Sequence, residues 1–102
     1  MVLSLDRLTS VIVSLLRKYQ AQDAILFGSY ARQEADEHSD IDLLVIGGPS
    51  FRPTDIFALA EELHQNTGKA VDVYELREID QTSAFYQTIL REGLTVAASA
   101  CT

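Results

Sequence analysis

The sequence is poor in the features that define several large classes of protein. Its only cysteine is Cys101, which excludes a disulfide framework and a thiolate metal cluster. Long hydrophobic runs are also missing, because Asp6, Arg7, Arg17 and Lys18 interrupt the apolar N-terminal stretch. We therefore expect neither a signal peptide nor a membrane span, and the lone cysteine favours a reducing, cytoplasmic setting.

Cations are scarce as well. Eight Lys and Arg residues face 15 Asp and Glu residues, which gives a net charge of -7. Because affinity for phosphates grows with the cations presented, this balance argues against direct nucleic-acid binding and suits a metal ion or a basic partner. With 102 residues, 47% of them hydrophobic, we expect residues 1–102 to form one compact domain, too small to add a second for a large substrate.

The apolar residues indicate alternating helices and strands. Spacings of three and four predict amphipathic helices, whereas short apolar runs bounded by glycine or proline predict strands. The predicted helices cover residues 5–19, 29–36, 53–66 and 81–91, and the predicted strands cover residues 23–28, 40–46, 70–74 and 94–97. The last helix is predicted to bury an apolar face of Phe85, Ile89 and Leu90. This order indicates the α/β class, with a sheet covered by helices.

Two aspartates on one predicted strand are the first candidate site. Side chains alternate along a strand, so Asp40 and Asp42 share a face, with Cα atoms roughly 6.6 Å apart. Such a pair can hold Mg²⁺ for displacement at phosphorus, although a solvated strand face would explain an isolated pair equally well. The apolar residues 43–46 favour the metal site, because an interior strand makes two unpaired like charges costly.

A glycine and a serine follow the first predicted strand. The backbone N–H groups of Gly28 and Ser29 could cradle a phosphate at the start of the predicted helix 29–36. Arg32, about one turn further, could neutralise a triphosphate. An ordinary turn with Ser29 as N-cap and Arg32 in solvent is the alternative, and no P-loop sequence is present.

Asp72 is the third candidate acid. Val71 and Val73 point to one side of their predicted strand, and Asp72 and Tyr74 point to the other. If this strand lies beside the 40–46 strand, Asp72 can join the metal site, hold the catalytic metal and help deprotonate an acceptor hydroxyl. A solvent-facing aspartate near a strand end is the competing interpretation.

Gly28-Ser29, ten intervening residues and Asp40-x-Asp42 before a hydrophobic run together resemble the polymerase-beta-like nucleotidyltransferase superfamily. The similarity is greatest to its minimal (MNT) members and covers nearly the whole chain. It implies a small mixed β-sheet with flanking helices, a triphosphate such as ATP on Gly28 and Ser29, two Mg²⁺ ions on Asp40 and Asp42, and Asp72 completing the catalytic metal's ligands. One departure is Gln33, where the family usually has glycine.

The resemblance also implies a partner. Minimal members are commonly paired with a HEPN protein, in what look like toxin–antitoxin systems. The implied reaction transfers AMP from ATP to a tyrosine hydroxyl of a co-encoded HEPN ribonuclease toxin. A domain too small to enclose its acceptor could receive it on a bound protein.

Two other functions stay open. One is a non-catalytic antitoxin that neutralises its partner by binding, which Gln33 favours and the three acids oppose. The other is an aminoglycoside-type nucleotidyltransferase, although those relatives add a drug-binding domain. We expect His38 and His64 to be surface residues rather than metal ligands.

Overall fold

The spacing of apolar residues near the start of the chain produces helix α1 (Leu5–Lys18) in the computed structural model, which describes residues 3–98. Ser4 caps this helix, because its hydroxyl accepts a hydrogen bond from the Arg7 backbone N–H at 3.2 Å. One face of α1 is buried, as the sequence predicted. That face packs on a sheet.

The sheet has four strands and is mixed. Their bounds are β1 (Asp23–Phe27), β2 (Ile41–Ile46), β3 (Val71–Glu75) and β4 (Leu94–Ala97), and their order across the sheet is β3-β2-β1-β4. Strand β1 is antiparallel to β2 and to β4, whereas β2 and β3 are parallel. The β2 strand is therefore interior, which explains its buried apolar run.

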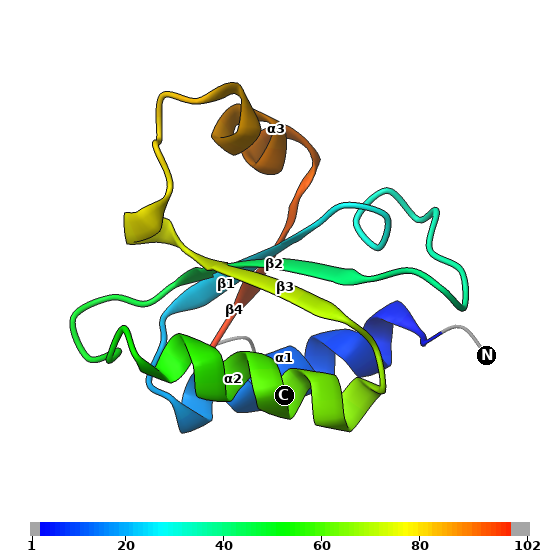
Figure 1. Ribbon diagram of the computed structural model, residues 1–102, viewed down its shortest axis with the longest axis horizontal. Coiled ribbons are helices and arrows are strands. Elements are labelled where there is room, and N and C mark those ends of the chain that lie inside the picture. The colour runs from blue at the N-terminus through cyan, green and yellow to red at the C-terminus, as the bar shows by residue number, and fades with distance from the viewer. Residues whose placement is uncertain (1–2, 99–102) are drawn as a thin grey trace.

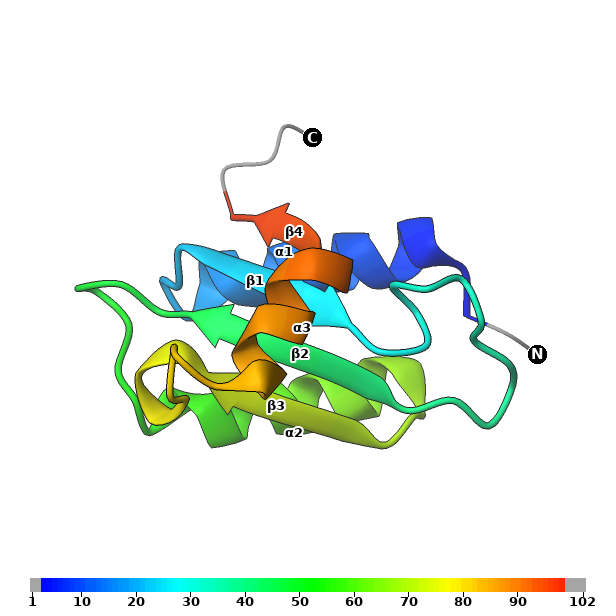
Figure 2. The same cartoon turned by 90° about the horizontal axis from the view of Figure 1, so that it is seen from above.

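The two faces of the sheet are covered unequally. Helices α1 and α2 (Asp55–Thr67) cover one face, and α3 (Ala84–Glu92) lies alone on the other, after the short 3₁₀ helix η1 (Leu76–Glu78) (Figures 1 and 2). The large core lies under α1 and α2, where residues such as Leu8, Leu43 and Leu63 are fully buried. No helix within residues 3–98 is long and apolar enough to cross a membrane.

The predicted helix over residues 29–36 is wrong. The chain forms only turns over residues 28–33, with hydrogen bonds from the Arg32 N–H to the Gly28 carbonyl and from the Glu34 N–H to the Ser29 carbonyl. Gly28 and Gln33 have φ angles of 76° and 60°, in the left-handed region. Because a right-handed helix cannot pass through such residues, the segment closes after one turn.

Two other helices begin later than predicted. Helix α3 begins at Ala84 rather than near residue 81, because Ser83 is its N-cap and accepts a hydrogen bond from the Tyr86 N–H at 3.1 Å. Asp80 holds the preceding residues in a turn by accepting from the Thr82 backbone N–H at 2.9 Å. Helix α2 begins at Asp55, so Pro53 lies just outside it.

Candidate functional site

The neighbouring parallel strands β2 and β3 bring two aspartates together near the end of the sheet where both strands begin. Asp42 of β2 is the cross-strand partner of Asp72 in the parallel strand β3, and of Phe27 in the antiparallel strand β1. Asp40 lies just before β2, and its side chain is exposed. The condition set for Asp72 is met, because β3 lies beside β2. We call Asp40, Asp42 and Asp72 the acid row.

The acid row has a strongly negative environment. Burial raises the pKa of the Asp42 carboxyl, and the nearby charges of Asp72 and then Asp40 raise it further, whereas Arg32 lowers it. A carboxyl that is half-buried among other carboxyls is costly to ionise. A cation placed there would remove that cost.

The backbone of Gly28 packs closely against the side chain of Asp42. A Cβ atom at this position would overlap the Asp42 carboxylate, and its φ of 76° disfavours other residues. A larger residue here would strain the backbone and displace the Asp42 carboxylate, so glycine lets the turn after β1 approach the acid row this closely. The helix N-terminus expected here is absent, so any phosphate contact would come from the backbone N–H groups of the turn itself.

Arg32 has carboxylate partners in this structure. Its Nε donates to Glu34 Oε1 at 2.9 Å, and its Nη1 lies 3.9 Å from Glu92 Oε2. The side chain is exposed, and it still acts on the pKa of Asp42 from across the turn. Surface ion pairs of this kind are weak and exchange readily, so Arg32 is available to a ligand phosphate.

The donor atoms suit a hard cation, but they are not gathered around one point. Within residues 3–98, no group of three or more His, Cys, Asp or Glu side chains is arranged to hold a metal ion. His38 is exposed beside Glu37, and His64 Nδ1 lies 2.7 Å from the Lys69 carbonyl oxygen. Both histidines are surface residues, as predicted. Carboxylate oxygens are the ligands Mg²⁺ prefers, so the acid row fits this ion chemically.

A cluster of aromatic rings lies beside the acid row and was not predicted from the sequence. The rings of Phe27, Tyr74 and Phe85 lie 5.6–6.1 Å apart between centroids. Phe85 and Leu90 were assigned to the buried face of their helix, but both are exposed, and Ile89 is the buried residue of α3. The alternation of Asp72 with Tyr74 was the available signal that an aromatic ring shares the acid row's face.

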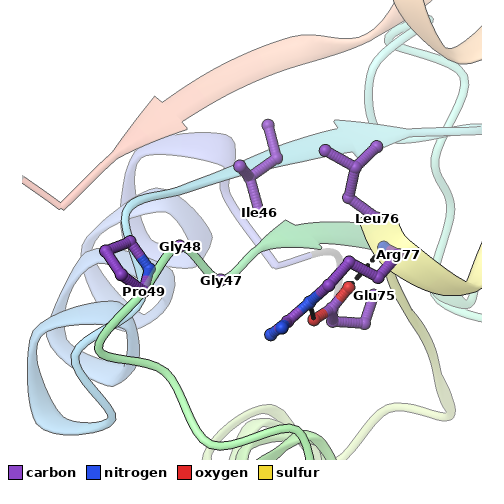
Figure 3. Close-up of a pocket in the computed structure, with 7 residues that line it drawn as sticks. All are labelled: Ile46, Gly47, Gly48, Pro49, Glu75, Leu76 and Arg77. Atoms are coloured by element: carbon purple, nitrogen blue, oxygen red, sulfur yellow. Dashed lines mark hydrogen bonds and ion pairs between the residues drawn. The ribbon is translucent and has the colours of Figure 1, made fainter.

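A separate cavity of about 330 Å³ lies where β2 and β3 end, at the other end of these strands from the acid row (Figure 3). Its lining residues are Ile46, Gly47, Gly48, Pro49, Glu75, Leu76 and Arg77. The Glu75 carboxylate is buried and accepts hydrogen bonds from the Arg77 backbone N–H and from Arg77 Nε, the latter at 2.7 Å. Glu75 and Arg77 thus satisfy each other's hydrogen-bonding groups. None of the residues that line this cavity belongs to the acid row.

Several known proteins are similar to this chain in sequence or in fold. The chain is 38% identical over 77 residues to the Methanocaldococcus jannaschii protein named "Putative protein adenylyltransferase MJ0435", covering 76% of this chain and 83% of that protein. A crystal structure described as a toxin–antitoxin with AMP-PNP has a TM-score of 0.74 and 26% identity, covering 90% of this chain and 74% of the other.

A second similar structure extends this pattern at the level of the fold. It is described as a tri-AMPylated Shewanella oneidensis HEPN toxin in complex with MNT antitoxin, with a TM-score of 0.69 and 24% identity over 92% of this chain and 72% of the other. The family model described as "Polymerase beta, Nucleotidyltransferase" matches residues 11–99. The chain therefore belongs to the polymerase-beta nucleotidyltransferase family, as a nucleotidyltransferase of the minimal type.

Proposed function

We propose that this chain transfers AMP from ATP to a tyrosine hydroxyl of a HEPN-domain partner, and so acts as an antitoxin. The observation that carries the proposal is the pairing of Asp42 with Asp72 beside the close-packed Gly28. Strands β1, β2 and β3 thereby place the proposed phosphate-binding turn and the acids at the same end of the sheet. The adenylyltransferase name of a relative and the AMP-PNP of a similar structure support ATP as the donor.

Each residue of the edge has a role in this proposal. The turn at Gly28 and Ser29 binds the triphosphate through backbone N–H groups and a hydroxyl, and Arg32 exchanges its surface ion pairs for a phosphate. Asp40 and Asp42 would hold two Mg²⁺ ions, and Asp72 would be a further ligand of the catalytic ion. When bound, the ions supply charge neutralisation at the attacking and leaving oxygens.

Asp72 also orients the acceptor. Its carboxylate takes the proton of the tyrosine hydroxyl as the hydroxyl oxygen bonds to the α-phosphorus of ATP. The bond from that phosphorus to the bridging oxygen breaks, and pyrophosphate leaves toward Gly28 and Ser29. Asp72 is exposed at an edge strand, where a protein-borne hydroxyl can approach.

A HEPN partner is supported by the structure of a HEPN toxin in complex with MNT antitoxin, whose fold the chain shares. The net charge of -7 suits a basic, RNA-cutting protein. An ATP-dependent exchange between two such proteins belongs to the cytoplasm, the setting expected from the sequence.

A binding-only antitoxin is the second candidate. It is favoured by the absence, within residues 3–98, of a ready-made group of three metal-ligating side chains. Under that function the acids would shape a surface, and toxin neutralisation would need neither ATP nor Mg²⁺.

Intact-mass spectrometry of the co-expressed partner separates the two. With the wild type, the partner should gain mass in whole AMP units; with Asp40→Asn and Asp42→Asn together, it should gain none. A matched control, Glu61→Gln with Glu78→Gln, removes the same charge from exposed positions away from the acid row and should leave the mass gain intact. Full neutralisation by the acid variant without any mass gain would establish the binding-only antitoxin instead.

Nucleotide binding can be measured without a partner. A ligand that binds only the folded state raises its melting temperature by mass action. ATP with Mg²⁺ should therefore raise the melting temperature of the wild type, and raise it much less for the double aspartate variant. No shift at millimolar ATP and Mg²⁺ would contradict the transferase.

A further inference from the structure

The aromatic cluster of Phe27, Tyr74 and Phe85 joins three separate elements of the fold. Phe27 ends β1, Tyr74 lies on β3 and Phe85 lies in the first turn of α3. The Tyr74–Phe85 and Phe27–Phe85 pairs are edge-to-face, with centroids 5.6 and 5.7 Å apart, so the rings support one another. Tyr74 is nevertheless 39% exposed and Phe85 45% exposed. The cluster therefore presents aromatic surface to solvent.

This aromatic surface is continuous with the acid row. Phe27 is the direct cross-strand partner of Asp42, and Tyr74 follows Asp72 by two residues on the same strand. Residues two apart on a strand share a face and lie roughly 6.6 Å apart. A group placed on the acid row would therefore meet the rings on the side toward α3.

The exposed rings lie on the side of the acid row that an acceptor would use. Gly28 follows β1, so the phosphate-binding turn lies on one side of Asp42, and Asp72 lies on the other. Attacking and leaving oxygens are roughly in line across the phosphorus, so an incoming hydroxyl enters from the side of Asp72. Strand β3, which carries Asp72 and Tyr74, is an edge strand and is open to a protein partner.

We propose that Tyr74 and Phe85, backed by Phe27, form the platform on which the aromatic ring of the acceptor tyrosine packs while its hydroxyl faces Asp72. This inference rests on the proposed transfer to tyrosine. It gives the chain a means of preferring an aromatic hydroxyl over serine or threonine, because only a ring gains the packing. The adenine ring of ATP is the other planar group in the proposed reaction, and packing of adenine on these rings is one outcome of the test.

Ring deletions test the platform with the complete chain and its HEPN partner. Tyr74→Leu and Phe85→Leu should each raise the KM for the partner by about two- to tenfold, the range expected for one aromatic pair. The affinity for ATP and Mg²⁺ by calorimetry should not change. Tyr74→Phe keeps the ring and should restore the wild-type KM. Phe57→Leu removes a 77% exposed ring from α2, on the far face, and should have no effect.

Three results would overturn the platform. A loss of ATP affinity in the leucine variants would assign the rings to adenine. An AMP adduct on Tyr74 of this chain would make that residue a modification target. Transfer by both leucine variants with unchanged KM would leave the proposed function standing and remove the platform alone.

A measurement without the partner separates failure of the platform from failure of the proposed transfer reaction. N-acetyl-tyrosinamide, titrated into the wild-type chain at high millimolar concentration, should shift the NMR ring signals of Tyr74 and Phe85 but not of Phe57. N-acetyl-leucinamide should shift none of them, and shifts of equal size with both probes would overturn the inference. Ring shifts without transfer to any partner would show a platform whose proposed reaction is wrong.

Discussion

The two faces of the sheet divide stability from chemistry. Among residues 3–98, the face under α1 and α2 carries a continuous core of 17 buried residues, whereas the buried cluster under α3 consists of Ile25, Leu44 and Ile89. The thinner face also carries Asp42, with its raised pKa, and the half-exposed rings of Tyr74 and Phe85. A dense core on one side lets the other side keep groups that are unfavourable for folding and useful for binding.

The largest expected effect comes from truncating one leucine on each side. Leu63 of α2 is fully buried in the large core, and Leu90 of α3 is about half exposed. Leu63→Ala should lower the free energy of unfolding by about 2–5 kcal/mol, because it removes buried contacts and leaves a cavity. Leu90→Ala should cost less than about 1 kcal/mol. Urea denaturation followed by circular dichroism measures both.

Equal losses in the two variants would contradict the division of the faces. A large loss for Leu90→Ala would mean that the α3 face supports the fold as strongly as the other. The AMP transfer expected from the chain should survive Leu90→Ala at temperatures where the variant is folded, since Leu90 lies outside the acid row and the ring cluster.

A smaller and opposite effect is expected from the acid row without metal. The pKa of Asp42 is raised in the folded chain by burial, Asp72 and Asp40, and lowered by Arg32. The folded state therefore binds more protons than the unfolded state just above the ordinary pKa of aspartate, and stability falls as pH rises through the raised pKa. Asp42→Asn should remove this loss and stabilise the metal-free chain at neutral pH.

Thermal melts in a chelator between pH 4 and pH 8 test this. The wild-type melting temperature should fall relative to that of Asp42→Asn as the pH rises, and added Mg²⁺ should raise the wild-type value but not that of Asp42→Asn. Glu61→Gln, on the far face, should parallel the wild type throughout. If the melting temperature of Asp42→Asn depended on pH in the same way as that of the wild type, the raised pKa of Asp42 would not be the cause of the stability loss.

Local patterns were sufficient for most of the sheet but not for the site's surroundings. Helix α1 was predicted from the spacing of its apolar residues, and the interior strand β2 was predicted from its short apolar run. The pairing of Asp42 with Asp72 depends on which strands are neighbours, which the β2–β3 crossover decides and local sequence only allows. The half-exposed Phe85 was misassigned because its helix period does not reveal how little of the sheet lies beneath it.

The prediction of a helix after β1 was wrong for a different reason. Ala31 and Arg32 are good helix formers, so propensity favoured a helix over 29–36. The left-handed conformation of Gly28 accompanies the close approach of the turn to Asp42, a tertiary contact, and Gln33 is a second left-handed residue that ends the turn. The structure also gives a physical reason for the family's glycine at position 33, since a φ of 60° suits glycine and strains glutamine.

The smallest expected effect follows from that strain. Gln33→Gly should raise the free energy of unfolding by about 0.5–1 kcal/mol, because relief of the left-handed conformation exceeds the added entropy of glycine in the unfolded chain. Gln20 has a φ of 61° at the end of α1, so Gln20→Gly is a control with the same relief elsewhere. Both variants should gain stability in urea denaturation. Gln33→Gly should maintain or improve the affinity for ATP and Mg²⁺, whereas Gln20→Gly should leave that affinity unchanged. A weaker affinity in Gln33→Gly would mean that the glutamine contributes to the phosphate site.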